Sequence, residues 1–218
     1  MNIALIDDHR IVRQGLRALL EKESDMIIVA EAEDGRQAVQ VVKNTRPDIV
    51  IMDIALPIMN GIEATRRIKS EFPEIEVLAL SMNMDKRYVT ELFNVGANGY
   101  LIKDCAAEEL VTAIRTIMAG ETYLSPPIAS LIVNSFVRKN PKSAIEHYEV
   151  DSHMPLTSRE REILQLYSEG KSTKIIAFEL DNSIKTIEAH KKQIMSKLQI
   201  FSIAELTKYA VREGLTSP

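Results

Sequence analysis

The sequence predicts an α/β fold, a doubly wound parallel sheet of five βα units, followed by a small all-helical domain. Two observations carry this prediction. Short aliphatic runs alternate with longer amphipathic ones over residues 1 to about 120, which is typical of a parallel sheet covered by helices. From Leu156 onward only helical periodicity remains.

Five aliphatic runs are the candidate strands, and each is followed by a helical pattern. They span residues 2–6, 27–32, 49–52, 77–80 and 99–102. In the first helical pattern we expect one apolar face, formed by Ile11, Val12, Leu16, Leu19 and Leu20. The arrangement is a (βα)5 unit of the flavodoxin-like type.

The pattern of strands and helices changes after Gly120. Ser125-Pro126-Pro127 predicts the start of a helix that runs to about Val137, because proline is tolerated in a first helical turn. Residues 139–154 are polar, lack sustained apolar periodicity and are typical of a linker. We therefore divide the chain into residues 1–122, a connecting region at 123–154, and residues 155–218.

The last part of the chain predicts four helices. Thr157 and Glu160 match a capping box at the start of the first. Ser172 caps a short helix through Leu180, whose inward residues are expected to be Ile175, Ile176, Ala177 and Leu180. Ser183 caps a helix over residues 184–198, and the last helix covers 202–213. Its apolar residues form a dimer seam or pack on their own domain: Leu206, Tyr209, Ala210 and Val211.

Charge and cysteine content limit the possible functions. The net charge is -4, but residues 155–218 carry ten positive and eight negative side chains and are +2, which leaves the remainder at -6. An acidic N-terminal part and a mildly basic C-terminal part of the chain favour two domains with different partners. One cysteine, Cys105, fits a reducing cytoplasm. The apolar runs are too short for a membrane helix.

Polar residues follow four of the predicted strands directly. Asp7-Asp8, Asp53, Ser81 and Lys103 stand at these positions, and the carboxyl ends of parallel strands meet at one edge of a sheet. Three carboxylates form an oxygen-rich cluster without His or Cys, which suits Mg²⁺. With Lys103 and Ser81 they can also hold a phosphoryl group on one carboxylate. The plainer interpretation is that each aspartate caps a helix.

The motifs LIDDHRIVRQGL, DIVIMDIALPIMNGIEA, ALSM and GANGYLIKD resemble the receiver domain of two-component response regulators over about residues 1–120. The resemblance implies that Asp53 is the phosphoacceptor and that Asp7, Asp8 and the carbonyl of Ala55 complete the Mg²⁺ site. It assigns the remaining roles as follows: phosphoryl contacts from Ser81 and Lys103, a switch aromatic at Tyr100, and the loop residues Pro57 and Gly61.

The C-terminal residues resemble the LuxR-type helix-turn-helix domain over nearly their whole length. With the receiver this is the NarL/FixJ arrangement. The resemblance implies that residues 184–198 form the recognition helix, with Glu188, Ala189 and Lys192 near base edges and Lys185, Thr186 and Lys191 near the DNA backbone. A plain helical bundle with solvated lysines is the alternative that charge alone leaves open. Ile175 and Asn182 depart from the family pattern.

These resemblances imply a transcription regulator that is switched by phosphorylation. A sensor histidine kinase would phosphorylate Asp53, and a homodimer would bind a roughly palindromic DNA site. On phosphorylation, Ser81 would move toward the phosphoryl group, and Tyr100 would fill the space that Ser81 leaves. This movement would relay the switch. Three alternatives are less favoured: a haloacid-dehalogenase phosphohydrolase, in which an Asp is expected where Ala55 stands, a receiver-like module independent of phosphate, and a ligand-sensing LuxR-type activator. We expect no enzyme.

Overall fold

The computed structural model describes residues 1–82, 84, 86–104, 107–137 and 156–216. The chain divides into two compact units, Met1–Lys142 and Ser143–Pro218. The predicted linker at residues 139–154 lies outside the described residues. In the described part of the chain, no helix has the length and apolar character needed to cross a membrane.

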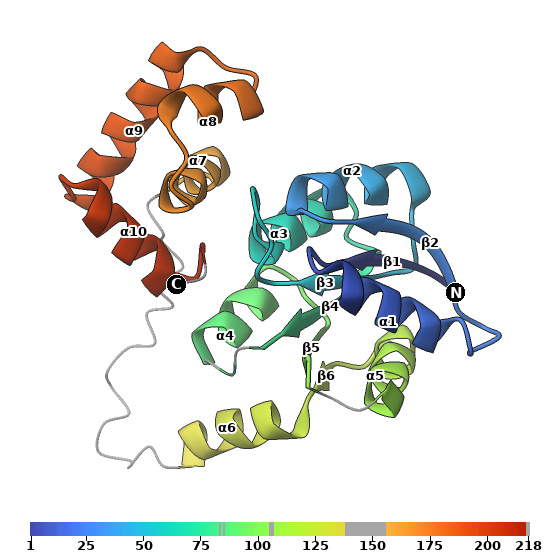
Figure 1. Cartoon of the computed structure of the whole chain (residues 1–218). Coiled ribbons are helices and arrows are strands. Elements are labelled where there is room, and N and C mark those ends of the chain that lie inside the picture. Colours follow the sequence, from blue (N-terminus) through green and yellow to red (C-terminus); the bar gives the residue numbers. More distant parts are fainter. Residues whose placement is uncertain (83, 85, 105–106, 138–155, 217–218) are drawn as a thin grey trace. The chain divides into compact units, whose positions relative to one another are not determined.

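A parallel sheet of six strands organises the first unit, in the order β2-β1-β3-β4-β5-β6 (Figure 1). The five predicted strands are confirmed, with shifts of one residue at three ends: β1 Asn2–Ile6, β2 Ile27–Ala32, β3 Ile49–Asp53, β4 Glu76–Ser81 and β5 Gly99–Ile102. The strand order reverses direction between β1 and β3. In doubly wound sheets, ligands bind outside the carboxyl ends of the strands at such a point.

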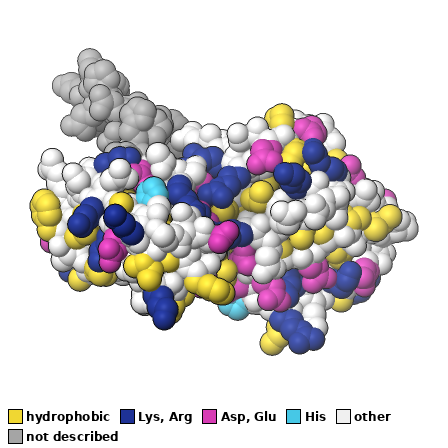
Figure 2. All heavy atoms as spheres, turned by 90° about the horizontal axis from the view of Figure 1, so that it is seen from above, with side chains coloured by type: hydrophobic (Ala, Val, Ile, Leu, Met, Phe, Trp, Pro, Cys, Tyr) yellow, Lys and Arg dark blue, Asp and Glu magenta, His cyan; other side chains and the backbone are white. Residues whose placement is uncertain are grey.

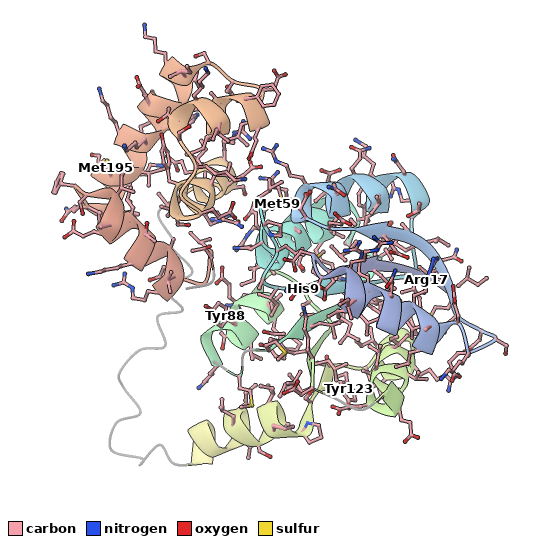
Figure 3. The ribbon with its side chains drawn as sticks, viewed as in Figure 1. His9, Arg17, Met59, Tyr88, Tyr123 and Met195 are labelled. Carbon is pink, nitrogen blue, oxygen red and sulfur yellow. The ribbon has the colours of Figure 1, made fainter. Side chains whose placement is uncertain are left out.

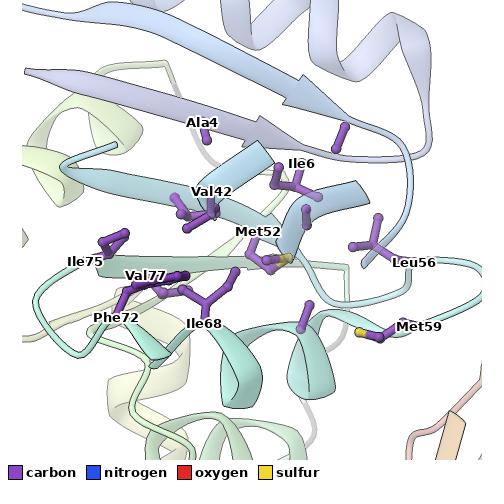
Figure 4. Close-up of a cluster of buried hydrophobic side chains, with 14 residues drawn as sticks. Ala4, Ile6, Val42, Met52, Leu56, Met59, Ile68, Phe72, Ile75 and Val77 are labelled. Carbon is purple, nitrogen blue, oxygen red and sulfur yellow. The ribbon is translucent and has the colours of Figure 1, made fainter. Parts of the chain in front are cut away.

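Helices cover both faces of this sheet. One face carries α1 (Arg10–Leu20) and α5 (Ala107–Met118), and the other carries α2 (Gly35–Thr45), α3 (Gly61–Glu71) and α4 (Lys86–Asn94). Because β3 is covered on both sides, all five of its residues are buried. Figure 4 shows the aliphatic cluster between the sheet and helices α2 and α3, with Ile6, Val42, Met52 and Ile68 at its centre.

The first helix presents most of the expected face, since Leu20 is buried and Leu16 and Leu19 pack against the same core, but Ile11 is not part of it. Ile11 is 84% exposed, while Arg13 is buried. The Arg13 guanidinium donates to the carbonyl oxygen of Asp7 at 2.5 Å and to Glu33 at 2.6 Å, so its charge is compensated inside the fold. The buried side of α1 therefore passes through Arg13 and Leu20 instead of through Ile11.

A short extension follows α5 and was only partly expected. The predicted helix is confirmed as α6, Pro126–Val137. Before it, β6 (Tyr123–Leu124) pairs with β5. Strand β6 is too short to produce a periodic pattern in the sequence. Ser125 is buried between them. Its backbone N–H donates to the carbonyl oxygen of Tyr100, and its Oγ accepts from the N–H of Ile102, both at 3.0 Å.

The second unit contains the four predicted helices: α7 Ser158–Ser168, α8 Thr173–Glu179, α9 Ile184–Leu198 and α10 Ile203–Arg212. Each begins at a hydroxyl side chain that accepts from a backbone N–H of the first turn: Thr157, Ser172, Ser183 and Ser202. Leu206 and Ala210 of α10 are buried within the domain, where α10 packs on α7.

One inward residue of α8 was predicted wrongly. Ile175 is 48% exposed, whereas Ile176, Ala177 and Leu180 are buried as expected. Consecutive residues of a helix are rotated by about 100°, so α8 cannot turn all four of these residues toward one neighbouring core. With Phe178, which is 87% exposed, Ile175 leaves an apolar pair on the surface.

Glu160 links the recognition-helix candidate to the rest of its domain. Its Oε2 accepts from the Thr157 N–H at 2.8 Å and lies 2.7 Å from Nζ of Lys197, which belongs to α9. Burial alone would raise the pKa of Glu160, but the bonds from Lys197 and Thr157 prevail and hold this pKa below its ordinary value of 4.5. The capping box thus also anchors the end of α9.

We expect Gly61→Ala to lower the free energy of unfolding of the first unit by about 1–3 kcal/mol. An added Cβ would stand 2.0 Å from the carbonyl oxygen of Asp53. Gly15→Ala is the matched control, because nothing lies within 4 Å of its Cβ and alanine favours a helix by about 1 kcal/mol. Urea denaturation, followed through the β3 amide signals in NMR spectra, measures the free energy of unfolding of both variants. Equal stabilities of the two variants would contradict the close contact.

Glu160→Gln should remove part of the pH dependence of the second unit. A carboxyl with a lowered folded-state pKa stabilises the fold above about pH 4.5, and this contribution is lost as the pH falls further. Glutamine keeps the capping-box hydrogen bond but not the charge. Urea denaturation of both proteins at pH 6 and pH 3.5, followed through α9 amide signals, should show the smaller pH effect in the variant. Equal losses on acidification would contradict this role.

Candidate functional site

The register of the sheet brings the polar residues after the strands to one edge. Ile6 pairs with Met52, so the residues that follow them, Asp7 and Asp53, begin side by side. On the other side of β3, Asp53 pairs with Leu80, which precedes Ser81. Ser81 pairs with Ile102, and the N–H of Lys103 donates to the carbonyl oxygen of Ser81 at 2.9 Å. Four strands thus present Asp7, Asp53, Ser81 and Lys103 at neighbouring positions.

Lys103 bridges the two buried carboxylates. Its Nζ lies 2.7 Å from Oδ2 of Asp7 and 2.7 Å from Oδ2 of Asp53. Burial raises the pKa of Asp53 above its usual range; Asp7 adds to this effect and Lys103 opposes it. Burial alone would lower the pKa of Lys103, but Asp53 and Asp7 reverse this and raise it. Lys103 therefore remains charged at neutral pH and compensates the carboxylates.

Asp7, Asp8, His9 and Asp53 form a group of possible cation ligands. Each of the four residues offers one ligand atom, and these four atoms all lie within 4.8 Å of one another. Three carboxylates are the donors that Mg²⁺ prefers, and two of them, from Asp7 and Asp53, are buried. The donor set therefore fits Mg²⁺. His9, at the N-terminus of α1 (Figure 3), was not singled out by sequence reasoning, although its place after Asp7-Asp8 was a usable signal.

The loop after β3 is tightly folded beneath Asp53. Oδ1 of Asp53 accepts from the N–H of Ala55 at 3.3 Å, and the N–H of Gly61 donates to the carbonyl oxygen of Ile54 at 2.9 Å. Ile58 has a φ of 67°, which is costly for a β-branched side chain and indicates local strain. Asn60 then caps α3 through its side chain. Ala55 itself is exposed at the surface of this loop.

Tyr100 is fully buried. Its neighbours in the cluster include Val89 and Leu92 of α4 and Ile128 of α6, which are also buried. The hydrogen bonds of Ser125 join α6 to the backbone on either side of Leu101. The predicted switch aromatic therefore belongs to the same buried cluster as residues of α4 and α6.

The six candidate DNA contacts lie along α9 but differ in accessibility. Lys185, Glu188, Ala189 and Lys192 are exposed. Thr186 is half-buried, and its hydroxyl group lies 2.7 Å from that of Ser183 in the helix cap. Lys191 places its Nζ 5.2 Å from the centre of the Tyr167 ring. The face of the protein shown in Figure 2 mixes acidic and basic side chains, so charge alone does not mark a binding region.

Comparison with known proteins identifies two family models in the chain. The model described as the response regulator receiver domain matches residues 3–115. The model described as bacterial regulatory proteins of the luxR family matches residues 154–210.

Individual proteins match over the same span. The oxygen regulatory protein NreC of Staphylococcus epidermidis is 39% identical over 216 residues, which is 99% of each chain, and that of Staphylococcus haemolyticus is 40% identical with the same coverage. A LuxR-family response regulator from Aurantimonas has a TM-score of 0.61 and 41% identity, covering 62% of this chain and 97% of its own. The response regulator RcsB in complex with DNA has a TM-score of 0.60 and 27% identity, covering 98% of both chains. The protein therefore belongs to the LuxR family of two-component response regulators.

Proposed function

We propose that this protein accepts a phosphoryl group from a sensor histidine kinase on Asp53 and binds DNA in response, as a transcription regulator. The observation that carries this proposal is the buried Asp53 carboxylate, held 2.7 Å from Lys103 and next to Asp7. A carboxylate oxygen of Asp53 attacks phosphorus, the new oxygen–phosphorus bond forms, and the phosphorus–nitrogen bond to the kinase histidine breaks.

The neighbouring residues have separate roles in this proposal. Asp7, Asp8, Asp53 and the carbonyl of Ala55 would hold Mg²⁺, which neutralises charge on the phosphoryl oxygens when bound. Lys103 and Ser81 contact the same oxygens. Phosphorylation adds about -1.5 to -2 charge units, so Lys103 is drawn away from its balanced position between Asp7 and Asp53. This redistribution of charge starts the switch.

Tyr100 and α6 supply a path from Asp53 to the second unit. Tyr100 lies on β5, three residues before Lys103, and is buried in the same cluster as Ile128. A shift of β5 toward a phosphoryl group moves the partners of Ser125 and so changes the packing of α6. Because interiors are close-packed, such small shifts favour one discrete arrangement over another.

The second unit supplies DNA recognition in this proposal, through the exposed residues of α9. RcsB, which is similar over 98% of its length, has been solved in complex with DNA and as two dimers on two DNAs. We infer a homodimer on a roughly palindromic site, a receiver at residues 1–122, a connecting region at 123–154 and a DNA-binding domain at 155–218. The single cysteine fits action in the cytoplasm.

A regulatory role is favoured over a phosphohydrolase. Hydrolases that use an aspartyl phosphate need an acid or base close to the nucleophile. The residue two positions after Asp53 is Ala55, which offers only backbone groups. The phosphoryl group on Asp53 would then persist long enough to act as a signal, as a switch requires.

Incubation with acetyl phosphate and Mg²⁺ should add one phosphoryl group to the wild-type protein and none to Asp53→Asn. The variant replaces the nucleophilic oxygen by an amide group of the same shape. Intact-protein mass spectrometry measures the adduct, and a kinase-transfer assay repeats the comparison with phosphohistidine as donor. An adduct of equal yield in Asp53→Asn would contradict the assignment of the phosphoacceptor.

Lys192→Ala should weaken binding to duplex DNA and reduce the dependence of affinity on salt by roughly one ion equivalent. Lys192 is exposed on α9. Lys208→Ala removes the same charge from an exposed position of α10 and serves as the matched control. Fluorescence anisotropy with labelled duplex over a salt series separates the two variants. Equal behaviour of both would mean that α9 does not face the DNA.

A further inference from the structure

Arg13 of α1 holds the backbone of Asp7 at the point where β1 ends. Strand β1 pairs with β2 as far as Ile6, and beyond it the N–H of Asp7 still donates to the carbonyl oxygen of Ala32 at 3.2 Å. The carbonyl oxygen of Asp7 accepts from Nη1 of Arg13 at 2.5 Å. Both backbone groups of Asp7 are therefore bonded, although this residue lies past the end of its strand.

Arg13 is itself fixed on its other side. Its Nη2 donates to Oε1 of Glu33 at 2.6 Å, and its Nε lies 3.5 Å from Oε2 of Glu31. The Arg13 side chain is only 7% exposed, and the donors of a guanidinium stand in a rigid, planar fork. The side chain therefore ties the end of β1 to the end of β2 and to the turn that follows it.

The direction of the Asp7 carboxylate depends on this backbone. Its Oδ2 lies 2.7 Å from Nζ of Lys103, and its Oδ1 accepts from the N–H of His9 at 2.8 Å. A rotation of the Asp7 backbone would displace both oxygens together. Groups that orient a metal ligand without touching the metal commonly change metal affinity by about 10- to 100-fold when they are removed.

We propose that Arg13 is a positioning residue for the cation site, which it serves by fixing the Asp7 backbone and so the direction of the Asp7 carboxylate. This inference rests on the Mg²⁺ site of the proposed function and deepens it. Arg13 contacts the site through the Asp7 carbonyl group, and Glu33 holds the guanidinium in place.

Charge gives the opposite expectation, which makes the proposal testable by direction. Arg13 has the same sign of charge as a bound cation, so removal of its charge alone would strengthen Mg²⁺ binding. Loss of positioning would weaken it. A purely structural role would lower the free energy of unfolding and leave the Mg²⁺ affinity of the folded protein unchanged.

The test measures Mg²⁺ affinity in the metal-free full chain, from amide signals of β1 and β3 in NMR titrations with Mg²⁺ alone. We expect Arg13→Met to weaken Mg²⁺ binding by about tenfold. Arg17→Met is the matched control, because Arg17 lies one turn further along α1 and also pairs with Glu31, with Glu21 as its other partner. The control should stay within about twofold of wild type or bind slightly more tightly.

A second variant keeps the charge and covers the case in which Arg13→Met does not fold. A lysine in place of Arg13 has one ammonium group and lacks the fork that joins Asp7 to Glu33. We expect Arg13→Lys to weaken Mg²⁺ binding by about threefold or more, and Arg17→Lys to match wild type. The carbon-13 signal of the Asp7 carbonyl group should shift in both Arg13 variants before Mg²⁺ is added, and not in the Arg17 variants.

Unchanged or tighter Mg²⁺ binding in Arg13→Met or in Arg13→Lys would overturn the proposal. Equal weakening in the Arg13 and Arg17 variants would also overturn it, since only Arg13 is proposed to act through Asp7. The proposed function fails separately, by absence of an acetyl phosphate adduct on wild-type Asp53, and the Mg²⁺ titrations do not depend on that reaction.

Discussion

The ammonium group of Lys103, 2.7 Å from both Asp7 and Asp53, is the interaction on which the first unit depends. Two buried carboxylates at adjacent strand ends repel each other strongly in a medium of low polarity. The lysine compensates this repulsion, and its own burial is tolerated only because the carboxylates surround it. A new charge on Asp53, as in the proposed phosphorylation, would disturb this balance.

The extension after α5 connects this edge of the sheet to α6, which is the path that the proposed function uses. Ser125 joins β6 and α6 to β5 through two hydrogen bonds, and Ile128 is buried in the same cluster as Tyr100. Strand β5 therefore carries Tyr100, which is buried in one cluster with residues of α4, and the attachment of α6. It is followed directly by Lys103, which contacts the phosphoryl group in the proposed function. Coupling between these parts needs no long-range mechanism, since they share four consecutive residues of backbone, Tyr100 to Lys103.

Polar contacts at helix ends connect the helices of the second unit. Each of its four helices has a hydroxyl cap, and Arg159 donates to Glu162 and to the carbonyl oxygen of Leu180 at the end of α8. With Lys197 bound to Glu160, these contacts fix α9 relative to α7 and α8. A recognition helix held in this way can present its exposed residues without using them for folding.

The sequence by itself determined the strands, the helical second unit and the residues at the strand ends, because buried parallel strands are continuous aliphatic runs and a polar residue directly after one is a local signal. Asp7, Asp53, Ser81 and Lys103 were found in this way. Only the tertiary structure decided features that depend on neighbours distant in the chain. Arg13 replaces Ile11 in the interior because Glu33 and the Asp7 carbonyl accept its hydrogen bonds. Likewise, β6 exists because β5 offers an unpaired edge, and His9 is placed by the turn that folds it back on Asp7.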